Sequence, residues 1–317
     1  MNSISPLVSI VVPCYNEEES VPIFIETISE VERSMPDTEF EYIFVDDGSR
    51  DGTLDILRGL SAKNARVRYI SFSRNFGKEA AILAGFEAAT GDYIAVMDAD
   101  LQDPPELLPE MYNAIVNDGF DCVATRRATR KGESPIRSFF ARMFYKLINK
   151  ISKTEIVDGA RDFRLMTRQV LDAVLSLTEY NRFSKGLFGW VGFQTKWIEY
   201  DNVPRVAGVT KWSFWKLFVY AIDGIIGFST APLAISTFFA IVLFLVSLIG
   251  AILLLIRRSM YGDLISLNWA WSMCAIFFVG SIQLLCMGIL GQYLAKTYLE
   301  SKQRPVYLIK EKSDDHK

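Results

Sequence analysis

Two long apolar segments without a charged residue constrain the fold of this chain more than any other feature. Residues 229–256 form a run of 28 uncharged residues, and residues 269–294 form a second run of 26. A helix of about 20 apolar residues crosses the hydrocarbon core of a bilayer, so each run is long enough to span a membrane. Only residues 257–268 lie between them. We therefore predict a hairpin of two transmembrane helices rather than two buried helices of a soluble protein.

A two-span hairpin places both chain ends on one side of the membrane, and the flanking charges indicate which side. The positively charged residues near the outer ends of the two runs are Lys211, Lys216, Lys296, Lys302, Arg304, Lys310 and Lys312. The connecting loop carries only Arg257 and Arg258. Because cytoplasmic flanks are rich in Lys and Arg, we predict cytoplasmic termini. Residues 257–268 are then an external loop, and residues 295–317 a cytoplasmic C-terminal segment.

The remainder of the chain, residues 1–205, has the pattern of a water-soluble α/β domain. Charged residues make up 22% of the whole chain, too many for a protein that is embedded throughout. Short β-rich apolar runs occur at Leu7–Pro13, Glu41–Val45, Val67–Phe72, Tyr93–Met97 and Asp121–Thr125. Amphipathic helical stretches follow at Ser20–Ser34, Gly52–Asn64, Gly77–Thr90 and Pro104–Asp118. This alternation predicts a mostly parallel sheet with helices on both faces.

Composition excludes several kinds of chemistry. A formal net charge of −3 offers no overall basic surface for nucleic acid. The only histidine, His316, lies in the polar C-terminal tail, and the four cysteines have no close spacing. Histidine-based catalysis, zinc sites and a disulfide framework are therefore not expected. The chemistry must rest on carboxylates, Arg and Lys.

The polar residues of interest follow the predicted strands, where α/β sheets bind ligands. Asp98, Asp100 and Gln102 come directly after the fourth strand, and their oxygens suit a hard cation such as Mg²⁺ or Mn²⁺. Turn formation is the ordinary alternative, with Asp103 as a helix cap. The chain has no glycine-rich phosphate loop, so a nucleotide would be held through the metal. Tyr15 could then stack on its base, and Asp47 could accept a hydrogen bond from a ring N–H.

Four segments closely resemble family 2 glycosyltransferases: VSIVVPCYNEEESV, FVDDGSRDGT, RNFGKEAAILAGFEAATGDYIAVMDADLQDPPELLP and DGARDFRLMTR. More narrowly, they resemble the polyprenyl-phosphate glycosyltransferases, which include dolichyl-phosphate mannose synthase and bacterial undecaprenyl-phosphate glucosyltransferases of the GtrB type. The resemblance covers the whole chain, including the pair of C-terminal spans. It implies a GT-A (Rossmann-like) catalytic domain, a Mg²⁺ or Mn²⁺ cofactor and inversion of the sugar anomer.

The resemblance also implies roles for individual residues. On the donor side, the nucleotide contacts would be Pro13, Tyr15, Asn16, Glu17, Asp47, Lys78 and Asp98, and the metal ligands Asp98, Asp100 and Gln102. On the acceptor side, the catalytic candidates would be Asp100, Asp158, Asp162 and Arg164, with Asp158 ranked above Asp162. A lipid monophosphate is already mostly dianionic at neutral pH, so Asp158 could orient the nucleophile instead of deprotonating it. The structural alternative for Asp158 is a loop cap.

The anionic lipid head needs cations at the membrane surface. The candidate phosphate ligands are Arg126, Arg137, Arg164, Arg205 and Lys211. Residues 135–152 and 211–228 have the pattern of interfacial amphipathic helices, and we place a juxtamembrane segment at 206–228.

The expected reaction is transfer of a hexose, first of all glucose from UDP-glucose, to undecaprenyl phosphate at the cytoplasmic face of a bacterial inner membrane. UDP-N-acetylglucosamine, UDP-galactose and GDP-mannose are the alternative donors. A processive polysaccharide synthase is disfavoured because the QxxRW signature and additional spans are missing. A catalytically inactive scaffold is disfavoured by the intact acidic motifs. A homo-oligomer such as a tetramer is expected, with Gly280, Gly288 and Gly291 as contact residues.

Overall fold

The computed structural model describes residues 5–128, 143, 145–146, 148–152, 157–201, 222, 224–261 and 269–313. Three of the predicted phosphate ligands, Arg137, Arg205 and Lys211, lie outside these residues, as does most of both predicted interfacial helices.

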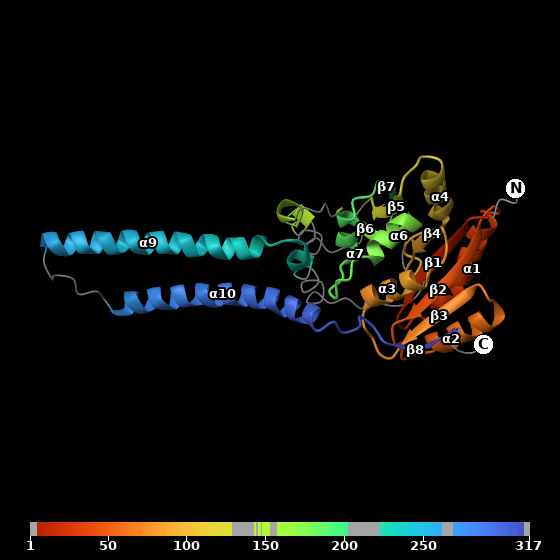
Figure 1. Cartoon of the computed structure of the whole chain (residues 1–317), viewed down its shortest axis with the longest axis horizontal. Helices are drawn as coiled ribbons and strands as arrows, with labels where there is room; N and C mark the ends of the chain where they lie inside the picture. The colour runs from red at the N-terminus through yellow and green to blue at the C-terminus, as the bar shows by residue number, and fades with distance from the viewer. Residues whose placement is uncertain are drawn as a thin grey trace.

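An eight-stranded mixed sheet forms the centre of the molecule, in the order β7-β5-β6-β4-β1-β2-β3-β8 (Figure 1). Its strands are β1 Leu7–Cys14, β2 Glu39–Asp46, β3 Val67–Phe72, β4 Tyr93–Val96, β5 Cys122–Arg127, β6 Ala160–Thr167, β7 Thr195–Tyr200 and β8 Ile309–Lys312. Strands β3, β2, β1 and β4 are parallel, and β5 and β7 form a parallel pair. Both β6 and β8 run antiparallel to their neighbours. The sheet is mixed but mostly parallel, as the strand and helix pattern predicted, because only β6 and β8 run against the direction of the other strands.

Helices cover both faces of the sheet, and this explains why the central strands are apolar throughout. One face packs against α1 Ser20–Arg33, α2 Thr53–Lys63 and α4 Leu108–Val116, the last preceded by the short helix η1 Pro105–Leu107. The other packs against α3 Lys78–Ala88, α6 Arg168–Leu175 and α7 Ser184–Trp190. Within β1, Ile10 and Val12 enter the first cluster and Val11 the second. The five predicted strands and four predicted helices are confirmed, whereas β6, β7 and β8 were not predicted.

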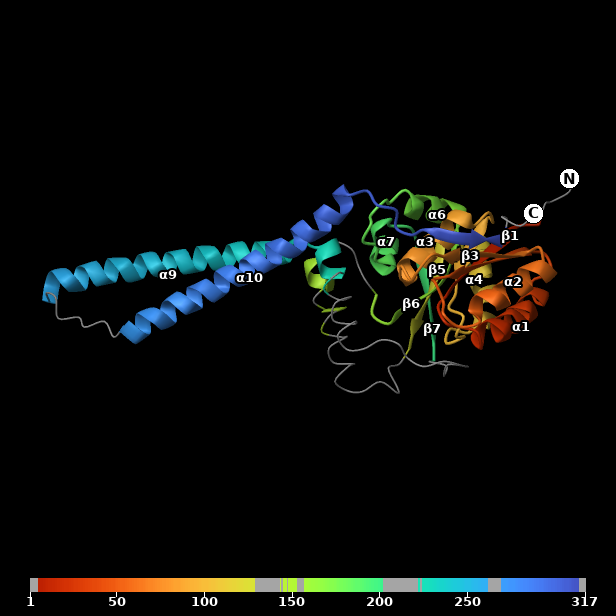
Figure 2. The same cartoon turned by 90° about the horizontal axis from the view of Figure 1, so that it is seen from below.

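Two long helices, α9 Ala231–Tyr261 and α10 Trp269–Ser301, project away from the α/β domain as a hairpin (Figures 1 and 2). By length and composition both qualify as membrane spans, over Ala231–Gly250 and Ala275–Ser301, and none of their most apolar portion is buried in the protein. Large side chains such as Phe238, Phe277 and Leu284 are exposed instead. The alternative of two buried helices of a soluble core is therefore wrong, and the helices are candidate membrane spans.

Both ends of the hairpin attach to the α/β domain. The Tyr293 hydroxyl of α10 donates to the Ser229 carbonyl at 2.6 Å, and the Ser229 hydroxyl donates to the Ile151 carbonyl at 2.8 Å. Near the end of α10, a Glu300 carboxylate oxygen accepts a hydrogen bond from the Tyr180 N–H at 2.9 Å. Beyond α10 the chain returns to the sheet as β8. Strand β8, within the predicted C-terminal segment of residues 295–317, thus joins the sheet of the α/β domain.

Candidate active site

The loops after β1 and β2 meet at the carboxyl edge of the sheet, as expected for neighbouring parallel strands. The Asn16 side-chain oxygen accepts a hydrogen bond from the Arg50 N–H at 2.8 Å, and the Glu17 N–H donates to the Thr53 hydroxyl at 2.8 Å. Asn16 has a φ of 53°, a left-handed conformation that Asn adopts more readily than most residues. Pro13 and Tyr15 are partly exposed at the same edge. The structure therefore brings the predicted nucleotide contacts together and shows that Asn16 and Glu17 also join the two loops.

Asp47 connects this edge to the loop after β3. Its carboxylate accepts hydrogen bonds from the N–H groups of Phe76 at 2.6 Å and Gly77 at 2.9 Å. Burial raises the pKa of Asp47 from 3.8 to about 6, although these two hydrogen bonds favour the ionised form. Asp47 thus organises the loop that leads to Lys78.

Lys78, the first residue of α3, bridges two carboxylates from different strands. Its ammonium lies 2.6 and 2.8 Å from the two carboxylate oxygens of Asp98, at the end of β4, and also pairs with Asp162 of β6. Burial alone would raise the pKa of Asp162, but the ammonium groups of Lys78 and Lys185 outweigh it and lower the pKa. Asp98 and Asp162, 64 positions apart in the sequence, therefore flank the Lys78 ammonium, and Asp162 remains ionised at neutral pH.

The loop after β4 carries the predicted metal ligands. Asp100 is buried, with 8% of its surface exposed, and its carboxylate accepts the Gln102 N–H at 3.2 Å. Leu101 between them has a φ of 53°, an unfavourable value for a branched residue. Among the described residues, no three His, Cys, Asp or Glu side chains are grouped as for a metal ion. The ligand set expected from the sequence contains only two carboxylates, Asp98 and Asp100, together with the Gln102 amide, so it is not such a group of three. Its donors are all oxygen atoms, which suit a hard cation, and one of them, the Asp98 carboxylate, is paired with Lys78 in this structure.

Asp103, expected as a helix cap, has a different role. The residue preceding η1 is Pro104, and no side chain caps that helix. Asp103 is 3% exposed, and its Oδ1 atom accepts hydrogen bonds from Arg161 Nε at 2.6 Å and from the Tyr200 hydroxyl. Its Oδ2 atom is buried without a hydrogen-bond partner in the described part of the chain. Asp103 thus anchors the acidic loop to β6 and β7, because a buried carboxylate needs such partners.

Strand β6 lies between β4 and β5 and places alternate side chains on opposite faces. Asp162 and Arg164 share one face, whereas Arg161 points to the Asp103 side. Arg164 is only 3% exposed, and its guanidinium carbon lies 3.6 Å from the centre of the Phe188 ring. Burial lowers the pKa of Arg164. The prediction of Arg164 as a ligand of the lipid phosphate is therefore not supported by this conformation, in which the side chain is enclosed.

The other acceptor-side candidates lie farther from this centre. Asp158 is exposed just before β6. Asp162 instead pairs with the Lys78 ammonium, which also pairs with Asp98. These contacts favour Asp162, and our ranking of Asp158 above Asp162 stays a prediction. Arg126, at the end of β5, forms an ion pair with Glu199, so its charge is already partly balanced.

Sequence reasoning missed two residues of this centre, both from the neighbourhood of α7. The Lys185 ammonium donates to the Ala160 carbonyl at 2.8 Å and lowers the pKa of Asp162. Lys185 has no carboxylate within ion-pair distance in the described part of the chain. Ser184 donates from its N–H, at 3.1 Å, and from its hydroxyl to Glu79 of α3. The only sequence signal was a basic residue in an apolar stretch, which does not reveal a neighbour more than twenty positions away.

Helix α7 also contacts the base of the hairpin. The Phe183 and Phe228 rings lie 5.9 Å apart, and both join a small cluster with Ile148. Gly186 must be small, because a Cβ there would lie 2.5 Å from the Phe228 ring. One short helix therefore lies between the charged centre and the residues that lead into α9.

The fold and the site together define a class: an α/β enzyme with an acidic site at the carboxyl edge of its sheet and two candidate membrane spans. The model of glycosyl transferase family 2 matches residues 9–175. The chain belongs to this family, and its α/β domain has the GT-A-like fold.

Similar proteins match over nearly their whole length. A bactoprenol glucosyl transferase of Shigella phage SfX is 40% identical over 96% of this chain and 98% of its own. The prophage bactoprenol glucosyl transferase homolog of Escherichia coli K12 gives the same values. An uncharacterized glycosyltransferase of Synechocystis, sll0501, is 41% identical over 95% of this chain and 94% of its own. Among solved structures, a glucosyl-3-phosphoglycerate synthase of Mycobacterium tuberculosis covers 70% of this chain and 78% of its own. Its identity is 19% and its TM-score 0.46, too low to support an inference about function.

Proposed function

We propose that this protein transfers glucose from UDP-glucose to a polyprenyl phosphate, such as undecaprenyl phosphate, at the cytoplasmic face of the membrane. The observation that carries the proposal is the position of α7, which contacts the charged centre on one side and the base of the candidate membrane hairpin on the other. A water-soluble donor could there meet an acceptor that stays in the bilayer. The names of the relatives support the same acceptor class and sugar.

The reaction that suits these residues is a direct displacement. A phosphate oxygen of the lipid attacks the anomeric carbon, and the nucleoside diphosphate leaves from the opposite face of the sugar. The lipid phosphate needs little deprotonation, because its second pKa is about 6. This agrees with the lowered pKa of Asp162, since an efficient general base has a pKa near the working pH. Asp162 would then orient Lys78 and the acceptor, and not remove a proton.

A divalent cation, Mg²⁺ or Mn²⁺, would be held by Asp98, Asp100 and Gln102 and would supply positive charge for the leaving diphosphate. Lys78 adds a second positive charge beside Asp98. Tyr15 and Asp47 would bind the nucleotide base.

We propose that both hairpin ends and the α/β domain are cytoplasmic. The return of the chain from α10 into β8 supports a common side for both ends, and the excess of Lys and Arg outside the loop supports the cytoplasm. A homo-oligomer is a further expectation. A Cβ atom on Gly280, Gly288 or Gly291 would meet nothing within 4 Å, so these positions leave room on α10 for a second copy.

The function is tested by a transfer assay with the full-length protein in detergent or membranes. Undecaprenyl phosphate and Mg²⁺ are offered with labelled UDP-glucose, UDP-N-acetylglucosamine, UDP-galactose or GDP-mannose in parallel. Label should enter the lipid with UDP-glucose. If label enters the lipid only from another donor, the transferred sugar is not glucose. If no donor gives transfer, the proposed reaction is refuted. UDP binding without transfer would favour the inactive scaffold, whereas a long glycan product would indicate a polysaccharide synthase.

Lys185 should bind the acceptor phosphate, because its positive charge is near enough to lower the pKa of Asp162 and its helix contacts the base of the hairpin. A charge-assisted hydrogen bond contributes about 1.5–3 kcal/mol, so Lys185→Ala should raise the KM for the lipid roughly tenfold or more. The KM for UDP-glucose should remain unchanged. Lys196→Ala is the matched control, since Lys196 pairs with Asp118 at the surface of β7. An unchanged lipid KM in the Lys185 variant would remove this role.

The pKa of Asp47, about 6, predicts a pH dependence of nucleotide binding. Below that pH the carboxyl is protonated and holds the Phe76 and Gly77 N–H groups less strongly. We expect the affinity for UDP, measured by calorimetry, to fall as the pH passes from about 7 to about 5. The effect on folding stability has the opposite sign. The pKa of Asp47 is raised in the folded state, so protonation at low pH relieves the free-energy cost of burying this carboxylate and stabilises the fold. Asp47→Asn should bind UDP more weakly at pH 7 and show no change near pH 6; retention of the wild-type profile would exclude Asp47 as its source.

A further inference from the structure

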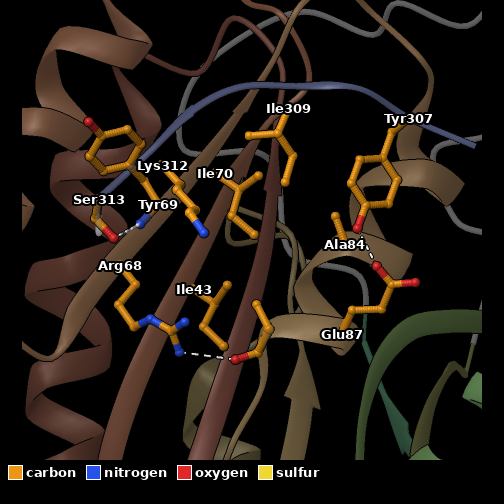
Figure 3. Close-up of a pocket in the computed structure, with 11 residues that line it drawn as sticks. Ile43, Arg68, Tyr69, Ile70, Ala84, Glu87, Tyr307, Ile309, Lys312 and Ser313 are labelled. Atoms are coloured by element: carbon orange, nitrogen blue, oxygen red, sulfur yellow. Dashed lines mark hydrogen bonds between the residues drawn. The ribbon is translucent and has the colours of Figure 1, made fainter. Parts of the chain in front are cut away.

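The chain that returns from the membrane hairpin contacts the donor side of the site. We call residues 306–312 the C-terminal strap. Its strand β8 pairs with β3, with Phe72 opposite Ile309 and Ile70 opposite Lys312. Figure 3 shows Ile70, Ile309 and Lys312 in this region. Glu311 of the strap accepts hydrogen bonds from Arg58 of α2 at 2.6 and 2.8 Å. The strap is therefore a bound part of the domain, held by backbone pairing and by side chains.

The strap packs against residues 73–77, which we call the donor loop. The Ser73 N–H donates to the Leu308 carbonyl at 3.0 Å. The Tyr307 ring stacks on Phe72, with ring centres 4.8 Å apart and planes inclined by 18°. Phe72 in turn meets the edge of Phe76 at 5.8 Å. Figure 3 shows the Tyr307 hydroxyl directed at Glu87 of α3, to which it donates a hydrogen bond. Tyr307 thus supports the donor loop from the side opposite the site.

The other side of the donor loop faces the residues proposed to bind the nucleotide. Asp47 accepts hydrogen bonds from Phe76 and Gly77, the last two residues of the loop. Gly48 allows the turn after β2 to lie directly against the donor loop, because a Cβ at this position would lie 2.5 Å from the Arg74 carbonyl carbon. Lys78 follows at once and carries the bridge between Asp98 and Asp162. The donor loop is therefore enclosed between the Asp47–Gly48 turn and the strap.

We propose that Tyr307 is a positioning residue for the donor site, which it holds in shape through Phe72 and the donor loop. The proposal rests on the proposed function for the identity of the donor. Its physical basis is that Tyr307 stacks on Phe72 and donates a hydrogen bond to Glu87, while Asp47 holds the other side of the donor loop. Through the strap, the segment that follows the second candidate span contributes to the nucleotide site.

The test compares Tyr307→Ala with Tyr307→Phe in the full-length protein. The phenylalanine variant keeps the ring on Phe72 and loses only the hydrogen bond to Glu87. We expect Tyr307→Ala to raise the KM for UDP-glucose and the Kd for UDP with Mn²⁺ together, by about tenfold, as loss of an aromatic pair can do. The lipid KM should stay constant, and Tyr307→Phe should resemble the wild type. Tyr298→Ala is a control, because Tyr298 is exposed on α10.

Hydrogen exchange of the donor loop provides a readout that does not depend on activity. The Phe76 and Gly77 amides should exchange faster in Tyr307→Ala than in Tyr307→Phe. Unchanged exchange would overturn the proposal even if the transfer assay had failed. Faster exchange with unchanged UDP affinity would also overturn it, since Tyr307 would then serve only the fold. If Tyr307→Ala does not fold, Phe72→Leu removes the other ring of the stack and must give the same pattern.

Discussion

Replacement of Asp100 by alanine should reduce sugar transfer by at least about 10³-fold, with the fold retained. The residue provides one of the two carboxylates proposed to hold the divalent cation, and loss of charge stabilisation at a leaving group has effects of this size. Asp100→Asn should be nearly as inactive, although it can still accept the hydrogen bond from the Gln102 N–H. The measurement is single-turnover transfer, together with Mn²⁺ binding followed by electron paramagnetic resonance.

Asp92→Asn is the matched control for the Asp100 variants. Asp92 precedes the same strand, β4, but lies at the opposite edge of the sheet, where it accepts a hydrogen bond from the Leu7 N–H at 2.9 Å. It should bind Mn²⁺ and transfer sugar as the wild type does. Wild-type turnover in Asp100→Ala would refute the assignment of Asp100 as a ligand of the divalent cation.

The second large effect should separate the two acceptor-side aspartates. Asp162→Asn should lower kcat by about 10²-fold or more, because it removes one of the two carboxylates that hold Lys78. Asp158→Asn should change kcat by about fivefold or less, since exposed charges contribute little. Measured kcat values for both variants at saturating donor and lipid decide the matter.

The opposite result, with Asp158→Asn inactive and Asp162→Asn active, would restore the ranking drawn from the sequence. A pH profile adds a further check. If Asp162 orients Lys78 and takes no proton, kcat should depend on pH in the same way in the wild type and in Asp162→Asn. A step near neutral pH that is present only in the wild type would identify Asp162 as a general base.

Much of the donor side was predictable because it depends on local pattern. Asp47, Asp98 and Asp100 each follow an apolar run, and the carboxyl ends of parallel strands converge at one edge. Regular alternation of strand and helix over residues 7–116 was enough to place these loops together. The prediction of Asp103 as a helix cap was wrong because it, too, used only local pattern. Its sequence neighbours form a good helix start, and its partner Arg161 lies 58 residues away.

The acceptor side was not predictable to the same degree. Strand β6 enters the sheet antiparallel between β4 and β5, which brings Asp162 next to Lys78 and encloses Arg164. The residues preceding β6 showed an acidic motif but no register, and a shift of one residue would have reversed the faces of Asp162 and Arg161. For this reason the sequence offered no sign that Asp162, rather than Asp158, contacts Lys78.

The sequence by itself determined that the chain has an α/β domain and two candidate membrane spans, because hydrophobic period and length are local properties. It also determined the acidic loop after β4. Only the tertiary structure decided that Lys78 joins Asp98 to Asp162, that Lys185 and α7 connect the site with the base of the hairpin, and that residues 306–312 return to the sheet. These contacts join segments that are from 20 to more than 200 positions apart. They depend on strand order and direction, which a single sequence does not encode as a local signal.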